Sequence, residues 1–195
     1  MANGPSTFGF EKSELRRKLF LYFFTNPDRR HYLREIAELI KVDPTNLSRE
    51  LKRREAEGIF LSEISGHQKY FSLNRSFQLY NEIKSTVHKT IGVPETLKSV
   101  LVNIPGIKRA FIYGSFAKGS EKGHSDIDVC LIIKKPEFSE SPVLEGFHRL
   151  ESELGREIFY LFFTEQEWGL KQMKKDCFVL GILKGKRIDL INERN

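Results

Sequence analysis

The chain has 195 residues, of which 39% are hydrophobic and 30% charged, a composition typical of folded globular proteins that argues against a disordered chain. No apolar run approaches the roughly 20 residues of a membrane span, no long apolar region stands near the N-terminus, and the two cysteines form no disulfide framework, so we expect a cytoplasmic protein without a membrane partner. The net charge is +6, with 16 Lys and Arg against 11 Asp and Glu in residues 1–90 and 16 against 15 in residues 91–195, which favours a polyanionic partner for the N-terminal half.

Three helices are predicted at the start of the chain. Apolar residues recur at helical spacing in residues 13–25, 32–40 and 45–57. Before the third of these segments, Asp43 is a good N-cap and Pro44 a good first helical residue. The third helix has a narrow apolar seam and otherwise carries polar and basic side chains.

Two strands, 59–64 and 69–73, are predicted after the third helix, around a turn at residues 65–68. A short helix, a tight turn, a polar-basic helix and a two-stranded wing form the pattern of a winged helix-turn-helix, whose second helix can enter the DNA major groove. Residues 11–75 resemble the winged helix-turn-helix domains of bacterial and archaeal transcriptional regulators. The resemblance implies double-stranded DNA as a partner and a homodimer, because paired half-sites lengthen the sequence that is read.

The candidate DNA contacts fall into two groups. Short polar or forked side chains suit base edges, and these are Thr45, Asn46, Ser48 and Arg49. Basic side chains suit phosphates, and these are Lys52, Arg53, Arg54 and Lys69. The alternative is a winged helix that serves protein contacts or dimerisation.

The junction between two domains is predicted at Gly92-Val93-Pro94, after a helix over residues 76–91. The domains are then 11–91 and 93–195. In the second domain we expect helices over 95–102, 143–154 and 165–175, and strands over 107–113, 125–133, 155–163 and 186–191. The predicted fold class is α+β with two domains, the second a small α/β unit with a mixed sheet.

Chemistry is concentrated in the segments 111–120 and 125–133. The first reads as a strand that ends at a Gly114-Ser115 turn opening a short helix, where free backbone N–H groups and the serine hydroxyl favour a phosphate. In the second, Asp126 and Asp128 share one face of a strand, because side chains alternate. Two carboxylates this close repel each other unless a cation lies between them, and oxygen ligands of this kind suit magnesium.

Gly114-Ser115, ten further residues and then Asp126-Ile127-Asp128-Val129 resemble the signature of the DNA polymerase beta-like nucleotidyltransferase superfamily, and the length resembles its minimal members. The resemblance covers roughly Val93 to Ile191. It implies that Gly114 and Ser115 bind a nucleoside triphosphate, with Lys118 and Ser125 as further nucleotide-binding candidates. It also implies that Asp126 and Asp128 are catalytic and hold Mg²⁺ or Mn²⁺.

The family also uses a third carboxylate on a later strand, and here the sequence leaves alternatives open. Glu157 lies on the predicted third strand with a parity that points it at the aspartate pair. Aligning Gly155-Arg156 with the glycine and basic residue that often precede the family's third acid puts that acid at Phe159 instead. Asp189 on the last strand is a further candidate, and absence of a third acid is the remaining alternative.

Three functions follow from these patterns. The first is a DNA-binding enzyme that transfers a nucleoside monophosphate from a nucleoside triphosphate to a hydroxyl acceptor. The second is a transcriptional regulator whose C-terminal domain senses nucleotide without turnover. The third, which only the resemblance to small nucleotidyltransferases implies, is an antitoxin with a toxin as its protein partner and acceptor.

Overall fold

The computed structural model describes residues 13–119 and 125–192, so residues 11–12 of the predicted first domain and Ser120 lie outside it. The chain divides into two compact units. The first runs to Val93 and includes Ser152–Gly155, and the second comprises Pro94–Glu151 and the chain from Arg156 onward. The division at Val93 lies in the segment where the sequence predicts the junction.

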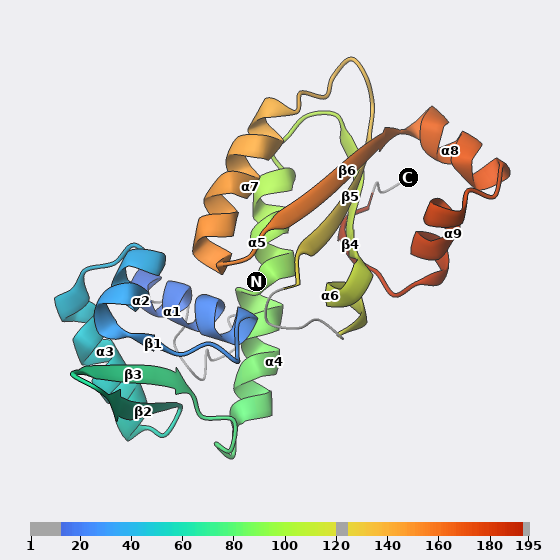
Figure 1. The fold of residues 1–195 in the computed structure, drawn as a ribbon. Coiled ribbons are helices and arrows are strands. Elements are labelled where there is room, and N and C mark those ends of the chain that lie inside the picture. The colour runs from blue at the N-terminus through green and yellow to red at the C-terminus, as the bar shows by residue number, and fades with distance from the viewer. Residues whose placement is uncertain (1–12, 120–124, 193–195) are drawn as a thin grey trace, which may run out of the picture. The chain divides into compact units, whose positions relative to one another are not determined.

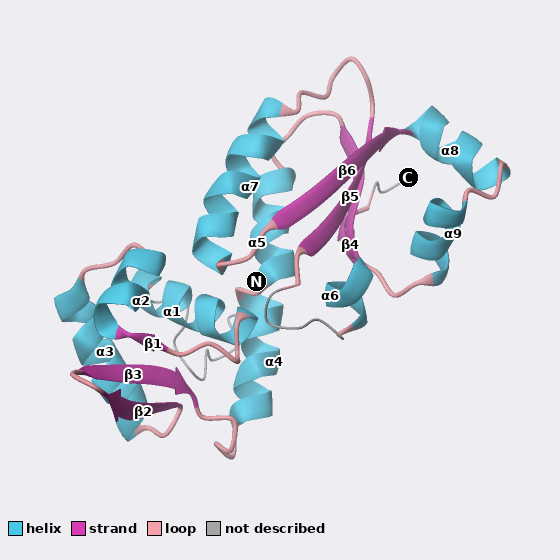
Figure 2. Cartoon of the chain, viewed as in Figure 1, coloured by secondary structure: helices cyan, strands magenta, loops and turns pink. Residues whose placement is uncertain are grey.

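The first unit contains helices and a small sheet. Its elements, labelled in Figure 1, are α1 (Glu14–Thr25), β1 (His31–Tyr32), α2 (Leu33–Leu39), α3 (Pro44–Ala56), β2 (Phe60–Ser65), β3 (Gln68–Leu73) and α4 (Tyr80–Thr90). The three strands form an antiparallel sheet in the order β1-β3-β2 (Figure 2). As predicted, the Asp43 side chain caps α3 by accepting a hydrogen bond from the Asn46 N–H, and Pro44 is the first helical residue.

The core of this unit is built by aromatic side chains of α1 that meet the sheet. The rings of Phe20 and Phe23 contact the ring of Phe60 edge-on, with centroids 6.2 and 4.9 Å apart. Leu47 and Leu51 of α3 are fully buried, as the apolar seam predicts. The helix α3 packs against α2 and β2, and this packing fixes which face of α3 stays exposed.

Two predictions for this unit are wrong in detail. The strand β1 was not predicted, because two residues are too few to show a periodicity. The helix α4 begins at Tyr80 and not at residue 76. The Asn74 side chain accepts a hydrogen bond from the Ser76 N–H, and such a turn competes with the start of a helix.

The second unit is built around a four-stranded sheet. Its elements are α5 (Val93–Leu101), β4 (Ile107–Tyr113), α6 (Gly114–Lys118), β5 (Ile127–Ile133), α7 (Ser141–Leu154), β6 (Ile158–Thr164), α8 (Glu165–Met173), α9 (Cys177–Lys184) and β7 (Ile188–Ile191). The strand order is β6-β5-β4-β7, with β5 and β6 parallel and the other pairs antiparallel. This is the mixed sheet that the sequence predicts.

Both faces of this sheet are covered over most of its length. Ile127, Val129 and Leu131 of β5 are buried on one face, as predicted, and α7 covers that face where Phe147 meets Tyr160. On the other face Phe111, Tyr113, Cys130 and Ile132 pack against Trp168 of α8 and against Val179 and Ile182 of α9. The start of β5, where Asp128 is half-buried, reaches the surface on this second face.

Several elements of this unit differ from the prediction, and three of the differences bear on the site or the junction. The helix α9 was missed entirely, and α5 begins at Val93, two residues before the predicted start. The strand β6 begins at Ile158, so Glu157 precedes the strand and is not part of it. In the described part of the chain, no helix combines the length and the apolar character needed to cross a membrane.

Candidate functional site

The turn at the end of β4 requires glycine for two reasons. Gly114 has φ +74°, in the left-handed region that side chains disfavour. A Cβ atom added at Gly114 would stand 2.1 Å from Oδ2 of Asp128, which is far inside van der Waals contact. The absence of a side chain therefore lets the backbone of the Gly114-Ser115 turn touch a carboxylate of the neighbouring strand.

The two aspartates lie at the start of β5. Asp126 is exposed and immediately precedes the strand, and Asp128 is half-buried opposite Tyr113 of β4. Burial, and then the negative charge of Asp126, raises the pKa of Asp128 above its usual value. The pair thus carries a repulsion that a bound cation would relieve.

The chemistry of this donor set fits a hard divalent cation, since both side chains offer carboxylate oxygens. Among residues 13–119 and 125–192, however, no group of three His, Cys, Asp or Glu side chains converges on one point. Asp126 and Asp128 would therefore hold Mg²⁺ or Mn²⁺ with two protein carboxylates.

The register of the sheet decides what stands beside Asp128. Tyr113 of β4 and Phe159 of β6 both pair with Asp128, so the three residues form one row across the sheet. Phe159 is 53% exposed although it is aromatic. The neighbour of Asp128 on the β6 side is thus an exposed ring and not a carboxylate.

The two candidates for a third acid lie at different places. The Glu157 carbonyl accepts a hydrogen bond from the Ile127 N–H at 2.9 Å, and the parallel register places Glu157 beside Asp126, about one strand spacing of 5 Å away. Asp189 pairs with Phe111 of β4, so β4 separates it from β5 by about two strand spacings, or 10 Å. Of the two, Glu157 is the closer to the aspartate pair.

Two neighbours of the aspartates have structural roles that the sequence did not indicate. Arg156 is buried, and its guanidinium donates a hydrogen bond of 3.3 Å to the carbonyl of Ser125, which fixes the backbone just before Asp126. Burial, followed by the charge of Asp128, raises the pKa of Tyr113 to about 12. Tyr113 therefore stays protonated at neutral pH and is unsuited to act as a base.

The remaining nucleotide-binding candidates lie close to the turn. Ser115 and Lys118 belong to α6, a single helical turn, and Ser125 is half-buried next to Asp126. A pocket of about 280 Å³ opens beside Gly114 and is lined on its other side by α9 and the segment after it, including Lys186. Lys186 was not among the predicted site residues, because α9, which brings this segment to the turn, was not predicted.

In the first unit, the predicted DNA contacts on α3 are mostly exposed. Thr45, Asn46, Arg49, Lys52 and Arg53 are exposed, whereas Ser48 is half-buried. Ion pairs already engage two of the exposed predicted cations, since Arg53 contacts Glu57 at 3.1 Å and Lys69 contacts Glu55 at 2.8 Å. Both pairs are exposed, and exposed pairs are weak enough to exchange.

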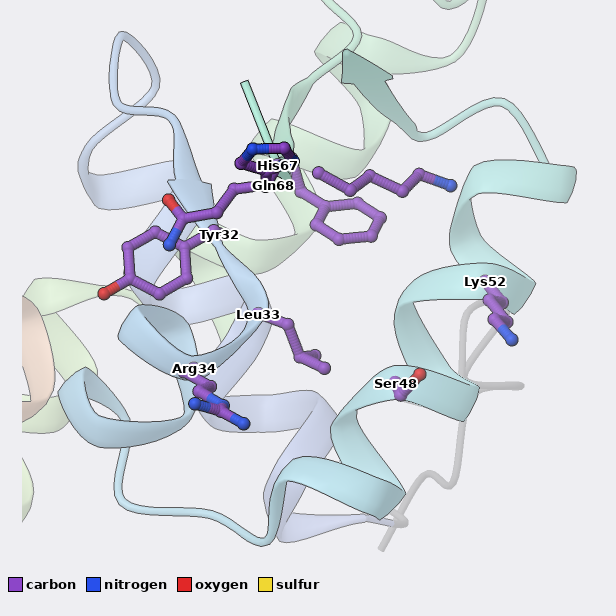
Figure 3. Close-up of a pocket in the computed structure, with 9 residues that line it drawn as sticks. Tyr32, Leu33, Arg34, Ser48, Lys52, His67 and Gln68 are labelled. Carbon is purple, nitrogen blue, oxygen red and sulfur yellow. The ribbon is translucent and has the colours of Figure 1, made fainter. Parts of the chain in front are cut away.

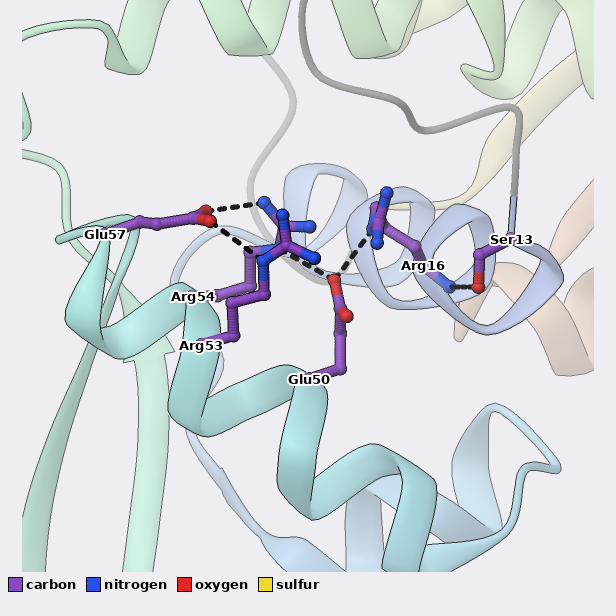
Figure 4. A network of polar contacts seen from close by, with 6 residues as sticks. All are labelled: Ser13, Arg16, Glu50, Arg53, Arg54 and Glu57. Carbon is purple, nitrogen blue, oxygen red and sulfur yellow. Dashed lines mark hydrogen bonds and ion pairs between the residues drawn. The ribbon is translucent and has the colours of Figure 1, made fainter.

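Arg54 corrects the prediction. Its side chain is 4% exposed and pairs with Glu50 at 2.7 Å and Glu57 at 2.5 Å (Figure 4), so it is not available to a phosphate. Glu50 also pairs with Arg16 of α1 at 2.8 Å. Burial by itself raises the pKa of Glu50, but the hydrogen bonds and charges of Arg16 and Arg54 outweigh burial and leave that pKa below its usual value.

A hollow of about 500 Å³ lies between α2, α3 and the β2–β3 hairpin (Figure 3). Leu33 and Phe71 contribute apolar surface to it, and Arg34, Lys52 and Lys69 contribute cations. Three predicted DNA contacts, Ser48 and Lys52 of α3 and Lys69 of the hairpin, thus line the same hollow.

Comparisons with known proteins give one match to a family. No curated protein matches the chain. Among solved structures, the chain is similar over 52% of its length to one described as "Crystal structure of the toxin-antitoxin with AMP-PNP", of which it covers 75%, with 17% sequence identity and a TM-score of 0.36. Residues 95–175, which include Gly114, Ser115, Asp126 and Asp128, match the model of the family described as Polymerase beta, Nucleotidyltransferase.

Proposed function

We propose that the protein is a metal-dependent nucleotidyltransferase that transfers a nucleoside monophosphate from a nucleoside triphosphate to a hydroxyl acceptor. The observation that carries the proposal is the direct approach of Gly114 to the Asp128 carboxylate, inside the segment that matches the family model. This approach joins a phosphate-binding turn to a pair of cation ligands. Neither feature alone would be specific, since glycine turns and acidic strand ends are common.

The reaction assigns a task to each residue. Backbone N–H groups of the Gly114-Ser115 turn bind phosphate oxygens. Because α6 is only one turn long, these N–H groups, and not a helix dipole, attract the phosphate. Asp126 and Asp128 hold the divalent cation, which when bound supplies positive charge to the transferring phosphoryl group. The acceptor oxygen bonds to the α-phosphorus as the bond to the bridging oxygen breaks, and pyrophosphate leaves.

The hydroxyl proton needs a base, and Glu157 is the candidate beside Asp126. Phe159 at the position beside Asp128 favours a second function, in which the C-terminal unit senses nucleotide without turnover and the protein is a transcriptional regulator. An antitoxin role stays a prediction, because the alignment with the toxin-antitoxin structure is too loose to support it.

We also propose that residues 11–75 form a winged helix-turn-helix that binds double-stranded DNA as a homodimer. The support is the order of the elements from α1 to β3, the antiparallel sheet β1-β3-β2 and the exposed polar and basic face of α3. The cations Arg34 and Lys52 around the hollow are suited to phosphates.

The proposed site is tested by calorimetry with a nucleoside triphosphate and Mg²⁺. The double variant Asp126→Asn with Asp128→Asn should lose the metal-dependent part of binding, because amides cannot replace two carboxylates as ligands. The control is Glu137→Gln with Glu145→Gln, which changes the net charge equally at two exposed positions of the same unit. Equal binding by the wild type and the aspartate variant would refute the site.

A further inference from the structure

The pocket beside Gly114 contains a cation, Lys186, that the sequence motifs do not indicate. It lies where β4 ends, between α6 and the chain from α9 to β7. Lys118 of α6 and Lys186, which follows α9, both line it, whereas no Asp or Glu of the described residues does. Among the residues that the structure describes, neither lysine forms an ion pair with a carboxylate.

The helix α9 lines the pocket without filling it. Gly181 faces it without a side chain, and a Cβ atom added there would meet nothing within 4 Å. Phe178, also on α9, packs edge-on against the ring of Tyr113 with centroids 6.0 Å apart. The pocket thus has an aromatic flank, a wall with free space and two ammonium groups.

We propose that this pocket binds the phosphate chain of the nucleoside triphosphate, with Lys186 as a second cation that complements Lys118. Ammonium groups are strong donors to phosphate oxygens, and a pocket whose described lining contains two of them and no carboxylate favours a multiply charged anion. The volume of about 280 Å³ is near the lower end of ligand pockets, which suits part of a nucleotide. The inference rests on the proposed function for the identity of the anion.

The assignment also orients the nucleotide on the sheet. The pocket lies on the β4 side of Asp128, whereas Phe159 lies on the β6 side. A phosphate chain in the pocket therefore leaves the β6 side, with Phe159 and Glu157, to the acceptor.

Cys177 provides a direct reporter of occupancy. It is exposed and lines the pocket, whereas Cys130 is completely buried, so an alkylating reagent should react at Cys177 first. In the full chain, tripolyphosphate and a nucleoside triphosphate with Mg²⁺ should each slow the alkylation of Cys177 at least fivefold. Adenosine, or sulfate at the same ionic strength, should leave the rate unchanged. Protection by adenosine but not by tripolyphosphate would overturn the proposal and assign the pocket to the base.

Two matched pairs of variants test the residues. Lys186→Ala should weaken tripolyphosphate binding roughly tenfold, because a charge-assisted hydrogen bond is lost, whereas Lys184→Ala, at an exposed position outside the pocket, should not. Gly181→Met should fill the pocket and abolish protection. The control Gly169→Met makes the same change at a position on α8 that also has free space around it. The proposal would be overturned if Lys186→Ala and Lys184→Ala bound tripolyphosphate equally well and if Cys177 were protected equally in Gly181→Met and Gly169→Met.

The outcomes separate this inference from the proposed function. If binding of nucleotide and Mg²⁺ depends on Asp126 and Asp128 but tripolyphosphate does not protect Cys177, the function stands and the pocket assignment fails. If tripolyphosphate protects Cys177 in a manner that depends on Lys186, while no nucleotide binds with a metal, the pocket assignment stands and the proposed function fails.

Discussion

At the scale of single residues, two glycines flank the one-turn helix α6 and have different tasks. Both Gly114 and Gly119 have positive φ, of +74° and +70°. Only Gly114 has a carboxylate against it, since a Cβ atom at Gly119 would meet nothing within 4 Å. Both glycines therefore have a left-handed backbone, and of the two only Gly114 lies against the Asp128 carboxylate.

This difference makes a prediction. Gly114→Ala and Gly119→Ala should each lower the free energy of unfolding by about 1–2 kcal/mol through left-handed strain, as measured by denaturant titration. Only Gly114→Ala should also displace Asp128, and it should weaken the binding of triphosphate and Mg²⁺ more than tenfold in calorimetry. Equal binding by the two variants would mean that contact between the turn and the carboxylate is not needed.

The residues of the site could be predicted to different degrees. The Gly-Ser turn and the aspartate pair are local patterns, so their spacing along the chain was sufficient to indicate them. The sequence already offered Phe159 as one position for the third acid, but its pairing with Asp128 follows from the register of β5 and β6, which depends on long-range pairing. Lys186 reaches the pocket through the path of α9, and no local pattern around it indicates a ligand.

At the scale of elements, α3 shows how periodicity was read incompletely. Leu47, Glu50, Leu51 and Arg54 follow the i, i+3, i+4, i+7 spacing of a buried stripe. Arg54 was nevertheless predicted as a surface cation because its charge was given more weight than its position. The two charged residues are tolerated on the stripe because they pair with each other, and Arg16 of α1 satisfies Glu50 further (Figure 4).

The helix α9 was missed for a different reason. Its sequence from Cys177 to Lys184 is short and almost entirely apolar, and such a run does not distinguish a helix from a buried strand. The Asp176 side chain, which accepts hydrogen bonds from the N–H groups of Phe178 and Val179, is the N-cap signal that could have identified it. The strand β4 was predicted with its observed bounds because Gly106 and Gly114 punctuate an apolar run at both ends.

The exposed face of α3 yields the prediction for DNA. Duplexes that bind the full chain would first be selected from a random pool. Lys52→Ala should weaken binding to selected and random duplexes alike and reduce the salt slope by about 1, because a phosphate contact is lost. Arg49→Ala should weaken binding to the selected duplex by about 1–3 kcal/mol more than to random DNA. The exposed control Lys89→Ala on α4 should have no effect, and failure of the wild type to bind any duplex at low salt would refute the DNA-binding proposal.

At the scale of the whole molecule, the two halves of the chain differ in net charge and in the chemistry proposed for them. The positive excess lies in residues 1–90, where the proposed partner is a polyanion, while residues 91–195 are nearly neutral and contain the proposed metal and phosphate sites. The proposed binding of DNA by residues 1–90 and the proposed transfer of a nucleotide by residues 91–195 are separate properties, and one can be present without the other. Turnover is therefore the measurement that distinguishes the enzyme from the nucleotide-sensing regulator.

The prediction on turnover uses the full chain with each radiolabelled ribonucleoside triphosphate, Mg²⁺ or Mn²⁺, and cell lysate as the source of acceptor. Label should pass to an acceptor with release of pyrophosphate. Glu157→Gln should lower this transfer at least 100-fold while triphosphate binding stays nearly unchanged, because a base acts on the acceptor hydroxyl and contributes little to nucleotide binding. Loss of transfer in Asp189→Asn and not in Glu157→Gln would move the base to β7.

Phe159 gives the same experiment a gain-of-function arm. Its side chain is 53% exposed on the edge strand β6, so Phe159→Asp should fold, which thermal melting can verify. If the position beside Asp128 is where the family matched by residues 95–175 uses its third acid, the new carboxylate should raise transfer, or create it where the wild type shows none. Phe159→Asn has the same shape without the charge and should not. Tight nucleotide binding without transfer in the wild type, together with transfer in Phe159→Asp, would identify a nucleotide sensor that lacks one catalytic carboxylate.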